Sequence, residues 1–420
     1  MKALVFRRKP VRFAAAVAAG RIAPGGGAGV GPLRHEDLDP LPLPGPGWVH
    51  ISPRLAGICG SDLATVDGRS SRWFEPVVSF PFVPGHEVVA DVADPDAAAT
   101  AGAPTGRVVL EPVLGCVARA IDPVCAACAR GDLGNCERIT FGSLAPGLQS
   151  GFCCDTGGGW STSMVAHVSQ LHAVPDTMSD EDAVMVEPTA CAVHAVLTTR
   201  IEPGATVVVL GTGTLGLLCV AAVRQLTGAG RIIAVAKHPA QRQWATDLGA
   251  DVVAEPEELA RAVRRVTGTL AIGDGAIDRL AGGADVVFDC VGSSESLAGA
   301  LEVTRPKGRV TLVGMAGHTR VDLTGLWQRE IELVGAYAYG TETLTNGTRR
   351  RTFDMAFELV AAAGLGRLVS ATYPLERYRE AIGHAAEAGR RGAVKVAFDL
   401  RRRRSSPASS PTESTEPGAH

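Results

Sequence analysis

One stretch of the chain constrains its fold more than any other, a glycine motif that directly follows a run of aliphatic residues. Thr206–Leu210 reads TVVVL, which predicts a strand buried on both faces, and the next six residues read GTGTLG. In such a motif the first glycine permits a tight turn, the second lets the backbone approach a pyrophosphate, and the third lets the following helix pack on the strand. Free N–H groups at the start of that helix bind the phosphates. The predicted dinucleotide-binding residues are Gly211, Gly213, Thr214, Leu215 and Gly216.

Strand-like and helix-like segments alternate after this motif. The expected helices are Leu215–Leu226 and Ala240–Leu248, and the expected strands are Arg231–Ala236, Asp251–Ala254, Val286–Cys290 and Arg309–Val313. A longer helical pattern at Ser179–Arg200 precedes the motif. Alternation of this kind predicts an α/β domain with a parallel, doubly wound sheet.

The chain before residue 179 has a different pattern. Short strands separated by Gly/Pro turns are expected at Trp48–Pro53, Val88–Val92, Arg107–Leu110 and Ser163–His167. Residues 20–46 are rich in glycine and proline, and we expect them to form an extended surface segment. The 420 residues are enough for two or three domains, so a β-rich domain is expected beside the dinucleotide-binding domain.

The end of the second strand of the dinucleotide domain bears on the choice of cofactor. An NAD site usually has Asp or Glu there, because a carboxylate accepts hydrogen bonds from the ribose hydroxyls. This chain has Ala236, followed by Lys237 and His238, with Arg242 nearby. No acid repels a 2′-phosphate, and the basic neighbours would attract one. The sequence therefore favours NADP over NAD, with the alternative that Lys237 and Arg242 are only solvated surface charges.

Three separate segments place metal-binding residue types in turn-like contexts. They read GICGSD around Cys59, PGHE around His86 and VEPTACAVH around Glu187. With the glycine motif, they resemble the zinc-containing medium-chain dehydrogenase/reductase family, which includes alcohol, polyol, sugar and threonine dehydrogenases. The resemblance extends from Met1 to about Leu400. It implies a GroES-like β-barrel catalytic domain, a Rossmann domain and a C-terminal return to the catalytic domain.

The resemblance also implies a catalytic zinc ion. Cys59, His86 and Glu187 would be its ligands, and Glu87 would lie beside the ion or exchange as a ligand. Zinc accepts sulfur, nitrogen and oxygen ligands in a tetrahedron and keeps one position open for substrate or water in catalytic sites. One thiolate and one carboxylate would neutralise the ion and leave it a moderate Lewis acid, which suits hydride transfer to or from a carbonyl carbon.

Two further residues have roles implied by the resemblance. Asp62 would orient His86 through the far ring nitrogen, and Ser61 would hydrogen-bond the substrate oxygen and pass its proton outward. Many relatives have a histidine three residues after the serine, where this chain has Ala64. Another group or water must then relay the proton, and His50 and His194 are candidates by residue type alone.

A cluster of cysteines predicts a second metal site. Cys125, Cys128 and Cys136 match the last three ligands of the family's structural-zinc lobe, expected at about residues 112–140. The first ligand is displaced, and either Cys116 or Asp122 would complete the set, with Cys116 favoured. A closed tetrahedron of this kind would hold a loop together and would not react.

Composition excludes several classes of protein. The net charge of −3 favours neither nucleic acid nor an anionic membrane, and no apolar run reaches 18 residues. Basic residues precede the apolar patch Phe13–Ala19, but the patch is too short and too rich in alanine for a signal peptide. We therefore expect a cytoplasmic protein, in which the ten cysteines are not expected to form disulfides. Residues 401–420 are expected to be a disordered tail.

The sequence therefore predicts a zinc-dependent NAD(P) oxidoreductase acting on an alcohol, polyol or sugar-type substrate, assembled as a homodimer or homotetramer. The expected boundaries are 1–178 for the catalytic domain, 179–340 for the Rossmann domain and 341–400 for the return segment. The alternatives are a zinc-free quinone or enoyl reductase and a non-catalytic dinucleotide-binding protein. Candidate residues for the substrate pocket are Trp73, Phe82 and Trp160, with Phe141–Trp160 as a loop near the cleft.

Overall fold

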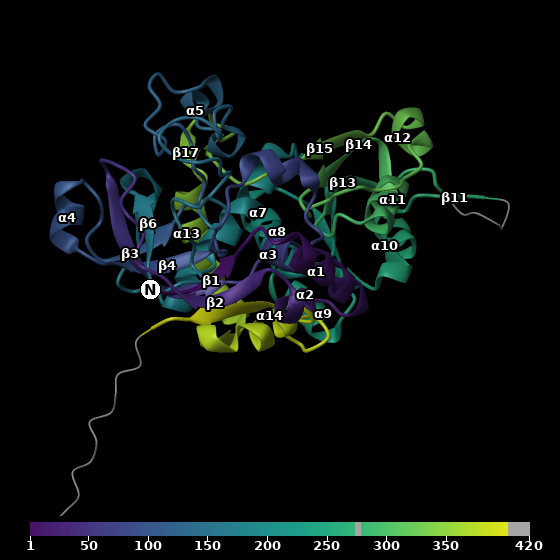
Figure 1. The fold of residues 1–420 in the computed structure, drawn as a ribbon. Coiled ribbons are helices and arrows are strands. Elements are labelled where there is room, and N and C mark those ends of the chain that lie inside the picture. Colours follow the sequence, from purple (N-terminus) through teal and green to yellow (C-terminus); the bar gives the residue numbers. More distant parts are fainter. Residues whose placement is uncertain (274–278, 402–420) are drawn as a thin grey trace, which may run out of the picture.

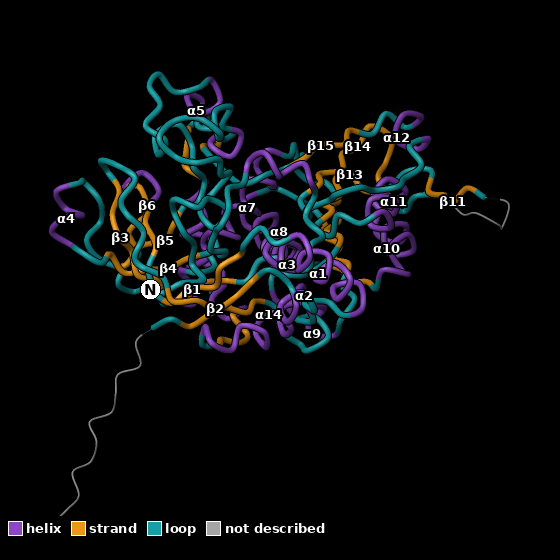
Figure 2. Tube along the Cα trace, viewed as in Figure 1, coloured by secondary structure: helices purple, strands orange, loops and turns teal. Residues whose placement is uncertain are grey.

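The structure is a computed structural model that describes residues 1–273 and 279–401, and the predicted tail beyond Arg401 lies outside the described residues. The predicted α/β fold, with a parallel-sheet dinucleotide domain beside a β-rich domain, is confirmed (Figure 1; strands are orange in Figure 2). No helix in the described part of the chain is long and apolar enough to cross a membrane.

The dinucleotide-domain sheet has six parallel strands in the spatial order β10-β9-β8-β13-β14-β15. Their bounds are β8 (Thr206–Leu210), β9 (Arg231–Val235), β10 (Val252–Ala254), β13 (Ala284–Asp289), β14 (Thr304–Leu312) and β15 (Glu332–Gly335). The helices of this part are α8 (Thr214–Leu226), α9 (Pro239–Asp247), α10 (Leu259–Thr267), α11 (Ser294–Val303) and α12 (Thr324–Gln328). The strand order reverses between β8 and β13, which is the position where doubly wound sheets bind dinucleotides.

The second sheet runs in the order β18-β19-β3-β4-β5-β7, with β6 paired to β3. The bounds are β3 (Trp48–Gly57), β4 (Val88–Val92), β5 (Arg107–Leu110), β6 (Met164–His167), β7 (Leu171–Ala173), β18 (Val369–Tyr373) and β19 (Lys395–Asp399). Because β19 pairs with β3, the end of the chain returns to a sheet that its first part began. Two-stranded sheets join β1 (Lys2–Phe6) to β2 (Leu33–Asp37), β11 (Ala271–Ile272) to β12 (Arg279–Leu280), and β16 (Thr341–Thr343) to β17 (Arg349–Arg351).

The helices associated with this sheet and with the junction are α3 (Gly60–Val66), α4 (Pro95–Thr100), α5 (Ala126–Arg130), α6 (Asp180–Ala183), α7 (Val186–Thr198), α13 (Thr352–Ala363) and α14 (Tyr378–Ala386). The single helix expected at Ser179–Arg200 is divided into α6 and α7. Pro188 lies in the first turn of α7, and in one continuous helix its ring would clash with the carbonyl of the residue four positions earlier. The break therefore falls just before the turn that carries Glu187.

The extended segment expected at residues 20–46 is wrong in part, because much of the region is regular structure. Helix α1 (Pro10–Ile22) contains the alanine-rich patch and begins with proline, both favourable for a helix. Helix α2 (Gly27–Val30) and strand β2 follow it. The buried carboxylate of Asp67 accepts the backbone N–H groups of Gly25 and Gly27 at 3.0 Å each, which fixes the connection between the helices.

A lobe that contains α5 projects from the molecule, at the top of Figure 1. The eight residues that displace the first cysteine of the predicted zinc lobe include Arg119, which is fully buried. Its guanidinium donates to the carbonyl oxygens of Leu114, Phe141, Leu144, Ala145 and Gly147. These hydrogen bonds from the eight inserted residues therefore connect the lobe to the start of the glycine-rich loop at residues 141–160.

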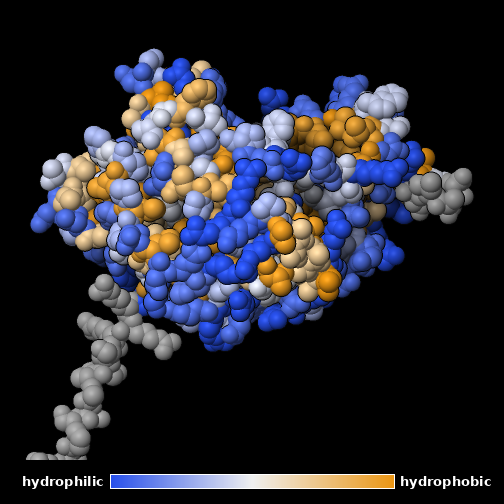
Figure 3. Space-filling model, in the orientation of Figure 1, coloured by the Kyte–Doolittle hydropathy of each residue, from blue (hydrophilic) through white to orange (hydrophobic). Residues whose placement is uncertain are grey.

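Apolar atoms gather at one end of the parallel sheet, around β14 and β15 (Figure 3). Strand β15 forms the edge of that sheet, and its four residues are all exposed, including Leu333 and Val334. Trp327, in the neighbouring helix α12, is 69% exposed. An edge strand with exposed apolar side chains is available to pair with another strand.

Candidate functional site

Each glycine of the motif after β8 has the property that a dinucleotide site requires. Gly211 has φ +82°, a region that residues with a side chain rarely adopt. A Cβ on Gly216 would lie 1.8 Å from the carbonyl oxygen of Gly211, so α8 packs against the turn only without a side chain there. A Cβ on Gly213 would meet nothing within 4 Å, so this backbone faces open space in which a pyrophosphate fits. Thr214 and Leu215 open α8, as predicted.

A group of possible metal ligands lies where α3 begins. The ligand atoms of Cys59, His86 and Glu87 all lie within 4.8 Å of one another. Cys59 is the N-cap of α3, and Asp62 at the third position of the helix accepts the Cys59 backbone N–H at 3.0 Å. This reciprocal capping arrangement explains why the spacing of Cys59 and Asp62 places both residues at the site.

Asp62 also faces the imidazole of His86. Its Oδ1 lies 3.5 Å from His86 Nδ1, and both atoms are buried. The far ring nitrogen, Nε2, is thus left to face the ligand group, as the predicted orienting role of Asp62 requires. Burial alone would lower the pKa of His86, but the charge of Asp62 raises it well above its usual value. The pocket around His86 thus favours a positive charge.

Glu87 has a partner that the sequence did not reveal. Lys395 Nζ donates to both carboxylate oxygens of Glu87, at 2.6 and 2.7 Å, and both side chains are buried. Burial would lower the pKa of Lys395, whereas the charge of Glu87 raises it, so the ammonium form persists. Lys395 comes from β19, and only the pairing of β19 with β3 brings it to this place.

This buried pair supports a prediction about stability. Lys395→Met should lower the free energy of unfolding by about 3–5 kcal/mol, because it leaves the Glu87 carboxylate buried without a counter-charge. Lys307→Met is the matched control, since the Lys307–Glu330 pair at 2.6 Å is well exposed and screened by solvent, so its loss should lower the free energy of unfolding far less. Urea unfolding of the zinc-loaded variants measures both values. Equal losses in the two variants would contradict the buried-pair argument.

Glu187, the predicted third ligand, lies outside the group of three but close to it. Its Oε1 accepts the hydroxyl of buried Tyr339 at 3.1 Å, and it lies in the first turn of α7. Burial raises the pKa of Glu187 to about 7; the charge of His86 opposes this shift and the charge of Glu87 adds to it. A cation bound nearby would favour the carboxylate form. Tyr339 is a site residue that the sequence pattern did not indicate.

The donor set fits a divalent cation. Sulfur, imidazole and carboxylate groups are the ligands zinc prefers; buried Glu87 lies in one group with Cys59 and His86, buried Asp62 faces His86, and buried Glu187 lies outside the group. Lys395 supplies one positive charge against them. An excess of buried negative charge is costly, so the arrangement requires a positive ion or protonation of the acids.

The four cysteines of the projecting lobe also fit zinc. Cys116, Cys125, Cys128 and Cys136 form one group, and Asp122 is not among them. The Cys116–Cys136 and Cys125–Cys136 Sγ distances are 3.7 and 4.0 Å. Sulfurs bound tetrahedrally at about 2.3 Å from zinc lie about 3.8 Å apart, whereas a disulfide requires about 2 Å. Of the two alternatives left by the sequence, the geometry favours Cys116.

The remaining predicted residues are distributed as follows. Ser61 is partly exposed in α3, beside buried Ala64. His194 is not in the ligand group, and its Nδ1 lies 2.6 Å from Glu342 Oε1. Phe82 and Trp160, proposed as pocket residues, are instead core residues that are 2% and 0% exposed.

Other aromatic residues lie nearer the ligand group. The ring of Phe152, in the predicted glycine-rich loop, is 6.1 Å from the ring of His86. Tyr337 follows β15, and the charges of His86 and Glu187 act on its hydroxyl, although burial is the main cause of its raised pKa. Trp73 is 84% exposed. Tyr337, which is 43% exposed, is therefore a further candidate for the substrate pocket, whereas Phe152 is buried against Phe82 in the same apolar cluster as Trp160.

The residues at the carboxyl end of β9, where the cofactor ribose is expected, match the sequence prediction in part. Ala236 is buried and Lys237 is exposed, with His238 as the N-cap of α9. Arg242 is already engaged, because it pairs with Glu255 at 2.9 Å. Its charge is therefore largely compensated within the protein.

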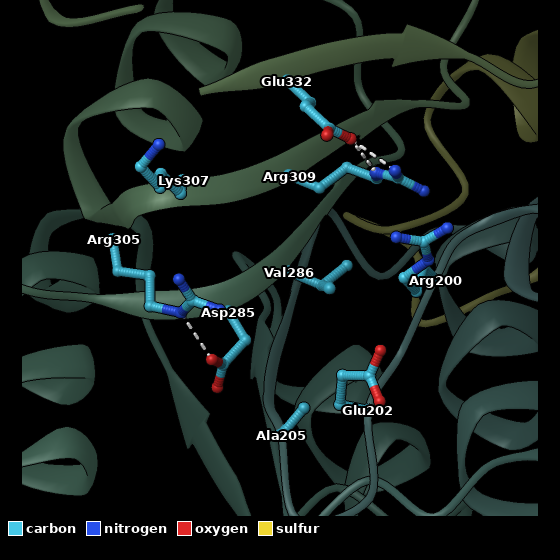
Figure 4. Close-up of a pocket in the computed structure, with 9 residues that line it drawn as sticks. All are labelled: Arg200, Glu202, Ala205, Asp285, Val286, Arg305, Lys307, Arg309 and Glu332. Atoms are coloured by element: carbon cyan, nitrogen blue, oxygen red, sulfur yellow. Dashed lines mark hydrogen bonds and ion pairs between the residues drawn. The ribbon is translucent and has the colours of Figure 1, made fainter. Parts of the chain in front are cut away.

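A hollow of about 180 Å³ lies at the opposite, amino-terminal edge of the parallel sheet (Figure 4). Its charged side chains largely pair with one another, Arg305 with Asp285 at 2.6 Å and Arg309 with Glu332. Ligands of doubly wound sheets bind at the carboxyl ends of the strands. This hollow is therefore not part of the dinucleotide or metal site.

Comparison with known proteins gives matches across most of the chain. Residues 45–176 match the alcohol dehydrogenase GroES-like domain, and residues 214–362 match the zinc-binding dehydrogenase domain. An L-idonate 5-dehydrogenase of Vitis vinifera is 29% identical over 370 residues, covering 86% of this chain and 90% of the relative. A "Probable D-xylulose reductase A" of Emericella nidulans is 30% identical over 324 residues, covering 74% and 81%. The crystal structure of 2R,3R-butanediol dehydrogenase from Bacillus subtilis has a TM-score of 0.66 at 22% identity, covering 95% and 99%.

Proposed function

Since the chain belongs to the zinc-type medium-chain alcohol and polyol dehydrogenase family, we propose that it transfers hydride between a polyol or sugar-type secondary alcohol and NADP. At the level of the family, the protein is a zinc-dependent oxidoreductase that acts on CH–OH groups with NAD(P). The proposal adds the substrate class and the preferred cofactor. The observation that carries it is the buried cluster of Cys59, His86 and nearby carboxylates, on a chain that also has the dinucleotide turn.

We assign Cys59, His86 and Glu187 as the ligands of the catalytic zinc. Glu187 is preferred to Glu87 because Lys395 already binds both oxygens of Glu87. When bound, zinc would lower the pKa of a substrate hydroxyl and nicotinamide would accept the hydride. Asp62 and Tyr339 hold the ligand side chains in place.

Substrate binding and proton transfer fall to the protein's own side chains. The hydroxyl of Ser61 would accept the substrate proton and pass it towards solvent, because this side chain is partly exposed and Ala64 offers no relay. The Tyr337 hydroxyl offers a hydrogen-bonding group for a second substrate hydroxyl. The relatives named for L-idonate and D-xylulose also support a polyhydroxylated substrate.

A panel of substrates tests this proposal. Sugar alcohols, sugar acids, butanediols and simple alcohols would be compared with NAD and NADP by the absorbance of the reduced cofactor. We expect the highest kcat/KM for a polyhydroxylated secondary alcohol with NADP, and two zinc ions per chain. If the protein reduced only quinones or enones and held one zinc ion per chain, that ion would be the one in the cysteine lobe. The result would favour a reductase without a catalytic zinc.

We also propose a homodimer, or a tetramer built from such dimers, in which β15 continues the parallel sheet into a second copy. The exposed edge and its apolar residues Leu333 and Val334 support this (Figure 3). Light scattering should give at least twice the 43.5 kDa mass of one chain, and Val334→Asp should halve the mass of the assembly. A cytoplasmic location stays a prediction, supported by ten cysteines without a disulfide and testable by cell fractionation.

A further inference from the structure

The segment between α14 and β19, residues 387–394, lies against the edge of the Rossmann domain that binds the dinucleotide. Thr214 Oγ1, at the first residue of α8, donates to the carbonyl oxygen of Val394 at 3.0 Å. A Cβ on Gly389 would lie 2.3 Å from Cδ2 of His238, the N-cap of α9. This return segment therefore spans from the phosphate turn to the ribose end of β9.

A cavity of about 160 Å³ lies at the ribose end. Three parts of the chain line it: Pro24 from the connection between α1 and α2, His238 after β9, and the end of α14 with the residues that follow, namely Ala386, Glu387, Gly389 and Arg390. Figure 1 shows α2, α9 and α14 grouped together there. The wall opposite His238 thus comes from outside the nucleotide-binding sheet.

Some charged side chains around this cavity form ion pairs within the protein, and others do not. Arg242 pairs with Glu255, and Glu387 accepts from Arg391 at 2.9 and 3.1 Å, which compensates the one carboxylate in the lining. In the described part of the chain, the side chain of Arg390 has no ion pair or hydrogen bond, and it is exposed to solvent. His238 is likewise without a side-chain hydrogen bond among the described residues.

We infer that Arg390 reads the 2′-phosphate of NADP from across this cavity and is a specificity-determining residue for the cofactor. The inference rests on the proposed NADP-linked function. A ribose at the end of β9 places its 2′-position beside residues 236–238, and Arg390 lines the same cavity as His238. A guanidinium binds a phosphate monoester with two parallel N–H donors, and no carboxylate at position 236 opposes it.

Calorimetric titration of the purified, zinc-loaded protein with NADP, NAD, 2′,5′-ADP and 5′-AMP tests this. Arg390→Ala should weaken NADP and 2′,5′-ADP by roughly 10- to 100-fold, as expected for the loss of charge-assisted hydrogen bonds. The affinities for NAD and 5′-AMP should change less than about twofold, because neither has the 2′-phosphate. Arg390→Lys should retain part of the affinity for NADP, since a lysine still supplies one positive charge.

Arg379→Ala is the matched control, because it removes an exposed arginine of α14 that does not line the cavity. It should leave all four affinities unchanged. An equal loss for NAD and NADP in Arg390→Ala would place Arg390 at the pyrophosphate and overturn the inference, as would no loss at all. Binding of 2′,5′-ADP requires neither substrate nor turnover, so an error in the proposed substrate class would leave this result intact.

Discussion

Cys59→Ser should lower kcat at least about 1000-fold while changing dinucleotide affinity less than about twofold. The catalytic zinc would lose its thiolate ligand, and a metal's stabilisation of transition-state charge is about 4 kcal/mol or more, which corresponds to about 1000-fold in rate. Serine is a favourable N-cap, so α3 should keep its first turn and hold Asp62 in place. The glycine turn at residues 211–216 is a separate structure and should bind dinucleotide normally.

Turnover, zinc content and dinucleotide affinity are measured together on the same preparation. We expect the zinc content to fall from two ions to one per chain. Cys154→Ser is the matched control, because Cys154 is half-buried and belongs to neither ligand group, so its kcat should be unchanged. A Cys59→Ser protein that turned over at the normal rate would exclude Cys59 from the metal site.

Cys116→Ser should remove the second zinc ion and loosen the lobe around α5. In small zinc domains the metal contributes about 10–16 kcal/mol of folding free energy, so a lobe that loses one of four ligands should unfold locally. The lobe contacts the chain near Tyr337, because a Cβ on Gly134 would lie 2.9 Å from the Cβ of Ala338. We therefore expect kcat to fall as well, through a displaced Tyr337.

Limited proteolysis and zinc analysis check this prediction. Cleavage between residues 116 and 147 should be much faster in Cys116→Ser than in the unmodified protein. Asp122→Asn tests the alternative ligand and should retain both zinc ions, since Asp122 is not in the cysteine group. If Asp122→Asn lost the second ion and Cys116→Ser kept it, the two assignments would be reversed.

The glycine turn and the cap of α3 could be predicted from sequence because their geometry depends on local spacing, whereas the catalytic-zinc ligands were implied by the family resemblance and stay a prediction. Cys59 and Asp62 are joined by one helix cap, and the three glycines each act within one turn between β8 and α8. Lys395 had no such signal, because it pairs with Glu87 across more than 300 positions of sequence. Phe82 and Trp160 were expected in the substrate pocket but lie in the core. The sequence does not distinguish the two places, because an aromatic residue near the cleft can pack into either.

By itself, the sequence determined the class of chemistry. The glycine motif after a buried strand predicts a dinucleotide-binding turn, and the residue types in three turn-like segments indicate a metal site. Only the tertiary structure decided which groups share a site. It paired Lys395 with Glu87 and Tyr339 with Glu187, and it placed Arg390 and His238 around one cavity. The physical reason is that burial and charge compensation depend on contacts between distant strands and helices, which no local pattern specifies.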